Sequence, residues 1–340
     1  MSITQGELQA LIASHPDLSG VVYVRQAGEV ILAQGYGYAN RADCVPNQAN
    51  TRFGIASGTK TLTAVAVCQL VEQGKISFDT RLKDCLDIPF PQFDPGVTVH
   101  HLLCHTSGIP DYFDEDQEAD ASFEALWRER PMYTMRQPQD FLPLFQNLPM
   151  KFAPGERFGY NNAGYIVLGL LIEQLTGQPF VQVLQEQVLQ RAAMVDSGCF
   201  ALDRLPERCA NGYIPTETGD WRTNIYAIPI ISQPDGGVFS TALDFTAFWD
   251  ALLNYRLLKP ETTTAMLHPH IQTEPGRAYG YGVYLIKVGD GWAYQALGSD
   301  PGVTFVSRVY PQQDILFTVM GNIEDPMWSF CGELAKYFAG

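Results

Sequence analysis

The spacing of apolar residues along this chain changes period several times, and each change predicts a different kind of element. Residues 3–14 have the pattern of an amphipathic helix. Residues 20–25 and 29–38 are rich in β-branched and aromatic side chains and flank a short turn, which predicts a β-hairpin. Residues 59–73 contain neither glycine nor proline and are apolar almost all round, which predicts a helix buried in the core.

The middle of the chain, from residue 76 to about 230, is rich in proline, aspartate and aromatic residues and carries helical patterns. These predicted helices cover residues 97–104, 122–130, 138–147, 162–176 and 179–191. From about residue 235 strand patterns return and predict an antiparallel meander closed by a helix. The predicted strands cover residues 279–288, 292–297, 303–310 and 315–320, and the helix covers about 326–338.

Strands at both ends of the chain and helices between them predict an α+β fold. We expect an antiparallel sheet flanked by helices and built from both termini, residues 1–75 plus 235–340, with a mostly helical domain inserted at 76–234. A cleft between two such domains is a common place for a ligand, so we expect the active site there.

The composition and charge of the chain argue against some classes of binding partner. The chain has 340 residues, of which 46% are hydrophobic, and a formal net charge of −15. Such an acidic chain, with no visible basic patch, is not expected to bind nucleic acid or an anionic membrane, and it suits neutral or cationic small substrates. No apolar run approaches the ~20 residues of a membrane span.

Seven cysteines are scattered without C-x-x-C spacing, so we predict neither a disulfide framework nor a zinc site, and no cofactor. Several lie in apolar surroundings and are expected to be small core residues. The first residues lack the basic and apolar regions of a secretion signal. We therefore expect a cytoplasmic protein, or an extracytoplasmic one if the chain is a processed form; the oligomeric state is open.

Ser57 and Lys60 stand at the start of the predicted buried helix, where residues three apart are neighbours. A serine hydroxyl becomes a nucleophile when a base removes its proton, and a lysine can act as that base when burial lowers its pKa. The free N–H groups at a helix N-terminus can stabilise an oxyanion. The alternative is an N-cap serine followed by a surface lysine, because this spacing alone is a weak signal.

Tyr160 and Asn162 lie at the start of the helix predicted over 162–176 and form a second candidate pair. A phenol near a lysine could exchange a proton with the leaving group, and an amide could hold the lysine or a substrate carbonyl. Gly-Tyr-Asn-Asn is also good turn chemistry, so a purely structural turn is the alternative.

His101 and His105 are four residues apart, which permits a metal pair on a helix, but no glutamate falls between them and no third ligand is evident. A structural His105 at the turn Thr106-Ser107-Gly108 is favoured, and no metal site is predicted. The acidic residues that follow are interpreted as a solvated loop, with a rim that attracts amines as the minor alternative. They are Asp111, Asp114, Glu115, Asp116, Glu118 and Asp120.

Four short motifs follow one another in an order that is found in one enzyme family. Ser57-Gly58-Thr59-Lys60 fits Ser-x-x-Lys, and Tyr160-Asn161-Asn162 fits Tyr-x-Asn. Residues 102–108 are similar to a Leu-Leu-x-His-Thr-Ser-Gly segment, and residues 152–158 to a Pro-Gly stretch before the tyrosine. Together they resemble the serine β-lactamase and penicillin-recognising hydrolases, on the branch of class C β-lactamases, D-alanyl-D-alanine carboxypeptidases, D-aminopeptidases and related esterases. The resemblance runs from about residue 18 to residue 320.

This resemblance implies a role for each matching residue. Ser57 would be acylated, and Lys60 and Tyr160 would share general-base and general-acid duties. Asn162 would orient Lys60 and the substrate amide. Which of Lys60 and Tyr160 takes the first proton is open.

The family's third motif, Lys-Thr-Gly or His-x-Gly, falls here on residues 296–298. Gly298 is kept, but Ala296 replaces the usual lysine or histidine. The N–H group of Ser299 would still complete an oxyanion hole. Loss of the cation disfavours substrates that present a carboxylate there, as β-lactams and D-Ala-D-Ala peptides do.

The predicted function is therefore a serine hydrolase that acts through an acyl-enzyme on an ester, small amide or peptide with a neutral or amino-bearing end. A β-lactamase or D-alanyl-D-alanine carboxypeptidase is the alternative within the same class. A non-catalytic penicillin-binding-like sensor or binding module is the alternative from another class.

Overall fold

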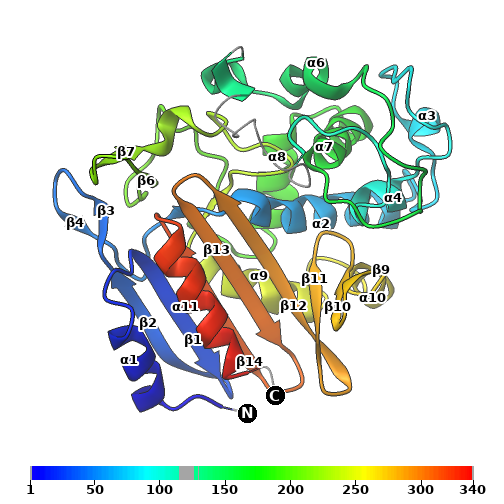
Figure 1. Cartoon of the computed structure of the whole chain (residues 1–340). Coiled ribbons are helices and arrows are strands. Elements are labelled where there is room, and N and C mark those ends of the chain that lie inside the picture. Colours follow the sequence, from blue (N-terminus) through cyan, green and yellow to red (C-terminus); the bar gives the residue numbers. More distant parts are fainter. Residues whose placement is uncertain (1, 115–125, 129, 339–340) are drawn as a thin grey trace.

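A computed structural model describes residues 2–114, 126–128 and 130–338 of the chain. Its largest element is an eight-stranded antiparallel sheet in the order β2-β1-β14-β13-β12-β11-β10-β9 (Figure 1). The predicted α+β fold, with a sheet built from both termini, is confirmed. The strands are β1 (Gly20–Gln26), β2 (Glu29–Tyr36), β9 (Ile271–Glu274), β10 (Arg277–Tyr279), β11 (Tyr284–Val288), β12 (Gly291–Asp300), β13 (Val303–Tyr310) and β14 (Ile315–Gly321).

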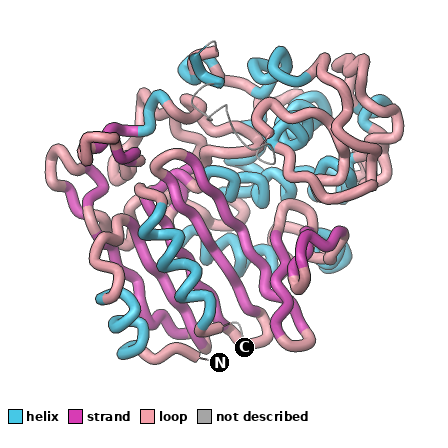
Figure 2. The backbone as a smooth tube through the Cα atoms, viewed as in Figure 1, coloured by secondary structure: helices cyan, strands magenta, loops and turns pink. Residues whose placement is uncertain are grey.

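Side chains of the sheet alternate between two faces, and each face carries its own hydrophobic core. Val22 and Val24 pack in one core with helices α1 and α11, which lie across one face of the sheet (Figures 1 and 2). Val21 and Tyr23 belong to the larger core on the other face, together with helices α2 and α9. The four helices are α1 (Gln5–Ala13), α2 (Thr59–Glu72), α9 (Ala242–Leu253) and α11 (Asp325–Lys336).

Between α2 and the C-terminal strands the chain forms a mostly helical region, at the top of Figure 1, as expected. Its long helix α7 is buried over most of its length and packs against α2. This region contains α3 (Leu82–Cys85), α4 (Val99–Leu103), α6 (Leu142–Phe145), α7 (Asn162–Thr176), α8 (Phe180–Leu184), the π-helical turn Gln185–Leu189, β6 (Tyr213–Pro215) and β7 (Trp221–Thr223). The domain boundaries near residues 75 and 235 stay predictions.

Short strand pairs lie outside the main sheet. β5 (Phe53–Gly54) pairs with β8 (Phe239–Ser240), which fixes the segment just before α2 against residues almost 190 positions further on. β3 (Tyr38–Asn40) pairs with β4 (Val45–Pro46) in a local hairpin that follows β2 (Figure 1). The β5–β8 pair matters for the site because Ser57 follows it directly.

The expected C-terminal pattern is wrong in two places. The strand expected over 279–288 is two strands, because the chain turns at Gly282, whose φ of 70° suits glycine, and the sheet then continues outward through β10 and β9. Two helices, α9 and α10 (Pro260–Met266), were not predicted. α9 buries Phe245, Phe248 and Trp249 on one face, but Leu243 on the opposite side is apolar and exposed, so the helix lacks the clear polar face that marks a surface helix.

Three further expectations can be compared with the structure. Of the helix expected over 122–130, residues 126–128 are helical, and most of the others lie outside the described residues. Cys68, Cys104 and Cys331 are buried, as expected of small core residues. Within the described chain, no single helix is long and apolar enough to cross a membrane; α7 and Phe180–Leu189 meet that test only as a pair bent by 83°.

Candidate active site

The proposed nucleophile lies in a tight turn between a strand pair and a helix. A 3₁₀ turn, Ala56–Gly58, joins β5 to α2, so Ser57 lies just before the first residue of the buried helix, where it was expected. Ala56 has a φ of 44°, an unfavourable conformation for a residue with a Cβ atom. Backbone hydrogen bonds hold it there, from Ile55 N to Val238 O at 2.8 Å and from Gly237 N to Ala56 O at 3.2 Å. The surrounding backbone thus presents Ser57 at the end of a buried helix.

Lys60 is only 2% exposed and its ammonium group lies at the centre of a polar cluster. Its Nζ atom is 2.9 Å from Ser57 Oγ, 2.8 Å from Asn162 Oδ1 and 2.7 Å from the carbonyl oxygen of Asp235. Two of these acceptors are more than 100 residues away in the sequence, so the fold assembles this cluster. The alternative of a surface lysine is wrong.

Tyr160 contributes an aromatic ring to the same cluster. The centroid of its ring lies 4.9 Å from Lys60 Nζ and 4.5 Å from the centroid of the His105 ring. The structure therefore brings Ser57, Lys60, Tyr160 and Asn162 together, although their catalytic roles stay predictions.

His105 holds the backbone that leads into α7. Its Nδ1 atom accepts the N–H of Asn161, and its carbonyl oxygen accepts the N–H of Gly159. Burial is the main reason why the pKa of His105 lies well below its usual value, so the ring is neutral with its proton on Nε2. The structural role predicted for His105 agrees with these contacts. The Nδ1 atom of His101 accepts the N–H of Thr98, and the described residues contain no group of three or more metal-binding side chains placed to hold a metal ion.

The edge of β12 lies against the nucleophile turn. Strand β11 pairs with β12 only as far as Gln295, so the remainder of β12 on that side faces the Ala56–Gly58 turn. A Cβ atom at Gly298 would lie 2.2 Å from Ile55 O and 2.7 Å from Ser57 N, which requires glycine at this position. Ala296 is 1% exposed and lies on the same strand face as Gly298. Ser299, the next residue, lines a cavity together with Ser57.

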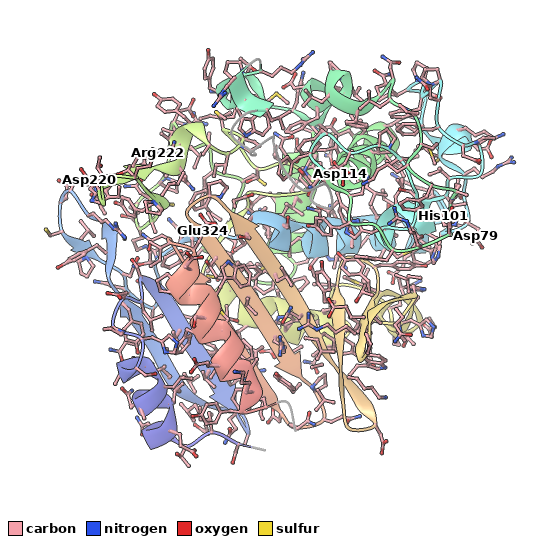
Figure 3. All side chains as sticks on the ribbon, in the orientation of Figure 1. Asp79, His101, Asp114, Asp220, Arg222 and Glu324 are labelled. Atoms are coloured by element: carbon pink, nitrogen blue, oxygen red, sulfur yellow. The ribbon has the colours of Figure 1, made fainter. Side chains whose placement is uncertain are left out.

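This cavity has a volume of about 270 Å³ and combines an apolar wall with an acidic rim. Asp235, Asp300 and Glu324 supply three carboxyl groups, and no lysine, arginine or histidine is among the described residues that line it. Glu324 directly precedes α11 and lies at the end of the sheet next to the inserted region (Figure 3). The other lining residues are Ser57, Tyr112, Phe113, Asn162, Ile228, Pro229, Ile231, Gln233, Gly236, Gly237, Ser299 and Pro301.

The interpretation of the acidic run as a solvated loop is wrong for its first residue. Both carboxylate oxygens of Asp111 accept backbone N–H groups at the start of α7, from Asn162 at 2.6 Å and from Ala163 at 2.9 Å. Burial raises the pKa of Asp111 to about 7, in spite of these bonds. Asp114 forms an ion pair with Lys151 at 2.8 Å. Glu115, Asp116, Glu118 and Asp120 lie outside the described residues.

Sequence reasoning also missed Tyr112 and Asp235. The phenol of Tyr112 donates a hydrogen bond to the carboxylate of Asp235, and burial raises the pKa of both groups. Asp235 lies in a Gln-Pro-Asp-Gly-Gly stretch that is typical of a turn, and nothing in its spacing connects it to Lys60.

Comparison with known proteins agrees with this geometry. Residues 8–338 match the sequence profile of the family described as Beta-lactamase. Penicillin-binding protein 4* of Bacillus subtilis (strain 168) is 27% identical over 291 residues, which cover 82% of this chain and 60% of that protein. Esterase EstB of Burkholderia gladioli is 32% identical over 206 residues, which cover 58% of this chain and 50% of that protein. The chain therefore spans 60% or less of the length of these two relatives.

Solved structures show the same fold over almost the whole chain. The crystal structure of a penicillin binding protein from Bacillus halodurans matches with a TM-score of 0.92 and 45% identity, covering 97% of this chain and 100% of that one. An octameric penicillin-binding protein homologue from Pyrococcus abyssi matches with a TM-score of 0.81 and 25% identity, covering 98% and 78% of the two chains.

Proposed function

We propose that this chain, which belongs to the Beta-lactamase family and is a serine hydrolase, cleaves an ester or small amide by forming an acyl-enzyme on Ser57. The observation that carries the proposal is the 2.9 Å contact between Lys60 Nζ and Ser57 Oγ inside a buried polar cluster. The name of one relative, the esterase EstB, supports ester cleavage.

In the acylation step, Ser57 Oγ attacks the substrate carbonyl carbon while the hydroxyl proton passes to Lys60 Nζ. A neutral lysine amine has two N–H groups and one lone pair. Asn162 Oδ1 and the Asp235 carbonyl accept the two N–H groups, which leaves the lone pair for the Ser57 hydroxyl. The same two acceptors then stabilise the ammonium group that forms.

The developing oxyanion is bound by the backbone N–H groups of Ser57 and Ser299, which stabilise it more than the ground-state carbonyl. Tyr160, whose ring lies beside Lys60, passes a proton to the departing alcohol or amine. Water then attacks the acyl carbon and gives one proton to the Tyr160 phenolate, while the Lys60 ammonium gives its proton to Ser57 Oγ as the bond to the acyl carbon breaks. A carboxylic acid and free Ser57 are released.

The charge of the cavity selects among substrates. The described residues that line the cavity include no cationic side chain, and Asp235, Asp300 and Glu324 would repel a carboxylate there. We therefore infer a preference for esters or small amides whose second end is neutral or bears an amine. A β-lactam or D-alanyl-D-alanine peptide presents a carboxylate and fits this cavity less well.

A substrate panel with a covalent label tests the proposal. A fluorophosphonate should label Ser57, located by mass spectrometry, and p-nitrophenyl esters or D-amino-acid anilides should be hydrolysed faster than a chromogenic cephalosporin. Preference for the cephalosporin would favour the β-lactamase alternative. A folded protein that neither labels at Ser57 nor hydrolyses any member of the panel would reject hydrolysis and favour a binding module.

A further inference from the structure

We propose that Asp111 and Tyr112 are positioning residues that fix the two carbonyl-type acceptors of Lys60 and thereby direct the lysine lone pair at Ser57. These two adjacent residues lie on the segment that follows the His-Thr-Ser-Gly turn, outside all four motifs. The inference rests on the proposed function, because it assigns their effect to the proton transfer between Ser57 and Lys60.

Asp111 acts on the first acceptor through the backbone of α7. Its carboxylate accepts the N–H groups of Asn162 and Ala163, so it fixes the residue whose Oδ1 atom accepts from Lys60. It is not needed as the N-cap, since Asn161 Oδ1 already accepts the N–H of Gly164 at 2.6 Å. Asp111 therefore adds a second constraint at the one end of α7 that faces the nucleophile.

Tyr112 acts on the second acceptor through a side chain. Its hydroxyl donates to the carboxylate of Asp235, and the carbonyl of that same residue accepts from Lys60 Nζ at 2.7 Å. Asp235 is only 6% exposed and lies two residues before Gly237, whose N–H donates to Ala56 O. The peptide unit that carries the Asp235 carbonyl is also held by the N–H of Gly236, which donates to Gln233 O at 3.1 Å. The hydrogen bond from Tyr112 adds a constraint on the side chain of Asp235.

Together the pair determines the direction of the lysine lone pair. When both N–H groups of the neutral amine are bound to their acceptors, the lone pair of Nζ points to Ser57 Oγ. If either acceptor moves, the amine can rotate so that an N–H group, instead of the lone pair, points to Ser57 Oγ. A displacement of about 1 Å at a reacting group can cost about 100-fold in rate. We expect the loss in kcat rather than in KM, because neither Asp111 nor the hydroxyl of Tyr112 is needed to bind the substrate.

Four single variants test this inference. Tyr112→Phe removes one hydroxyl and Asp111→Asn replaces one acceptor oxygen with a donor. Tyr281→Phe and Asp244→Asn are matched controls, since Tyr281 is a buried phenol bonded to His100 at 2.9 Å and Asp244 is a buried carboxylate that accepts the N–H of Asp196 at 2.7 Å.

For p-nitrophenyl ester hydrolysis we expect kcat to fall about 10-fold in Tyr112→Phe and about 100-fold in Asp111→Asn, with KM within about twofold of the wild type. Both controls should stay within about twofold in kcat. The rate of fluorophosphonate labelling at Ser57 should fall with kcat. A test variant that retains wild-type kcat, or a control that loses as much activity as its matched test variant, overturns the inference.

Two further measurements separate the inference from general loss of structure and from failure of the proposed function. Tyr112→Phe/Asp235→Ala should be no slower than the slower single variant, because both changes remove the same hydrogen bond; fully additive losses contradict the inference. In crystal structures, the distance from Lys60 Nζ to Asp235 O should exceed the wild-type 2.7 Å in Tyr112→Phe, and the distance to Asn162 Oδ1 should exceed 2.8 Å in Asp111→Asn. An unchanged distance rejects the inference even if the wild type hydrolyses nothing.

Discussion

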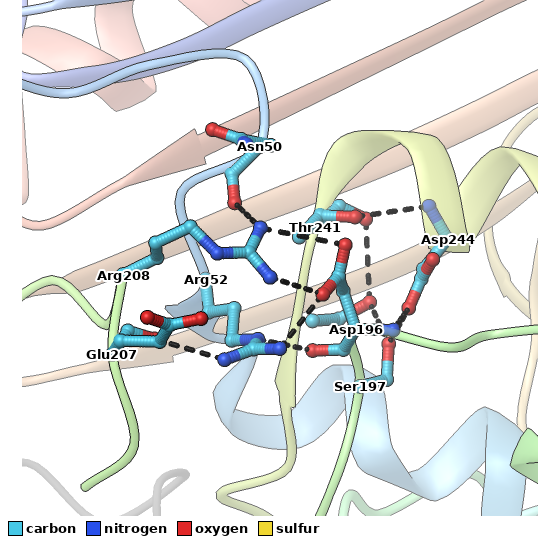
Figure 4. A network of polar contacts seen from close by, with 9 residues as sticks. Asn50, Arg52, Asp196, Ser197, Glu207, Arg208, Thr241 and Asp244 are labelled. Carbon is cyan, nitrogen blue, oxygen red and sulfur yellow. Dashed lines mark hydrogen bonds and ion pairs between the residues drawn. The ribbon is translucent and has the colours of Figure 1, made fainter.

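Two polar clusters connect the inserted region to the rest of the molecule, and they differ in how their charged groups are paired. Around Asp196, one carboxylate faces two arginines near the surface (Figure 4). Around Lys60, one buried lysine lies close to two buried carboxyl groups, Asp111 and Asp235. The comparison indicates that a cluster which stabilises the fold has satisfied charges, whereas the candidate active site keeps groups that can change charge.

The Asp196 cluster has the geometry of an ion-pair network. Arg52 donates to the carboxylate of Asp196 at 2.7 Å and to its carbonyl oxygen at 2.8 Å, and Arg208 donates to the same carboxylate. The hydrogen bond from Arg208 is the main reason why the pKa of Asp196 is lowered. Arg52 lies just before β5, so this network holds the strand pair that precedes Ser57.

In the Lys60 cluster burial outweighs the hydrogen bonds. The pKa of Asp111 rises to about 7 although three backbone N–H groups favour its charged form, and the pKa of Asp235 also rises. Buried acids with raised pKa values are typical of functional sites more than of structural ion pairs. The two clusters should therefore respond differently to mutation and to pH.

The largest expected effect is on activity. Ser57→Ala should abolish ester turnover, and Lys60→Ala should lower it by ~10³-fold or more, as members of a catalytic unit usually do. Asp196→Ala should retain turnover within about twofold, because it does not contact the cavity. Steady-state assays on p-nitrophenyl esters measure all three, and turnover by Ser57→Ala at the wild-type rate would exclude the covalent mechanism.

The second effect is on stability. Asp196→Ala should lower the free energy of unfolding by about 1–2 kcal/mol, because two arginines near the surface lose a shared hydrogen-bonded partner. Ser57→Ala should change it by less than about 0.5 kcal/mol. Urea unfolding followed by circular dichroism gives both values. Equal changes in the free energy of unfolding of the two variants would contradict the proposed difference between the clusters.

The pH dependence of stability should have opposite signs in the two clusters. The lowered pKa of Asp196 means that its stabilisation is present above the ordinary aspartate value of 3.8 and is lost as the pH falls through its folded value. The raised pKa of Asp111 means that folded protein binds more protons between 3.8 and about 7, so stability is lost as the pH rises through this window.

Unfolding of the wild type, Asp196→Ala and Asp111→Asn between pH 3 and pH 8 measures this difference. The destabilisation caused by Asp196→Ala should shrink toward pH 3, whereas Asp111→Asn should gain stability relative to the wild type toward pH 8. If the free energies of unfolding of the wild type and of Asp111→Asn change with pH by the same amount, Asp111 does not titrate with a raised pKa.

The smallest expected effect is on specificity. Ala296→Lys should raise kcat/KM for a carboxylate-bearing ester about threefold relative to its neutral analogue, because Ala296 shares the face of β12 on which Gly298 meets the Ser57 turn, and a cation there would attract a carboxylate. The preference should weaken with added salt. A ratio that is unchanged at low salt would show that position 296 does not contact the substrate.

Much of the fold and part of the candidate site could be predicted because they depend on local pattern. The spacing of Ser57 and Lys60 follows from the geometry of one helix turn, and the strands β1, β13 and β14 follow from short runs of β-branched residues. The pattern does not predict helix α9 because that segment is apolar on more than one side, and it predicts one continuous strand over 279–288 because the turn at Gly282 leaves the surrounding apolar pattern unbroken.

The sequence by itself determined the family, the sheet built from both termini and the helix-borne Ser57–Lys60 pair, since these depend on residues within a few positions of one another or on ordered motifs. Only the tertiary structure decided which groups surround that pair. Asn162 and Asp235 are 102 and 175 residues from Lys60, and Asp111 reaches α7 from 51 residues away. Contacts over such separations, and the burial that raises the pKa of an otherwise ordinary acid, arise from packing and have no periodic signal in the chain.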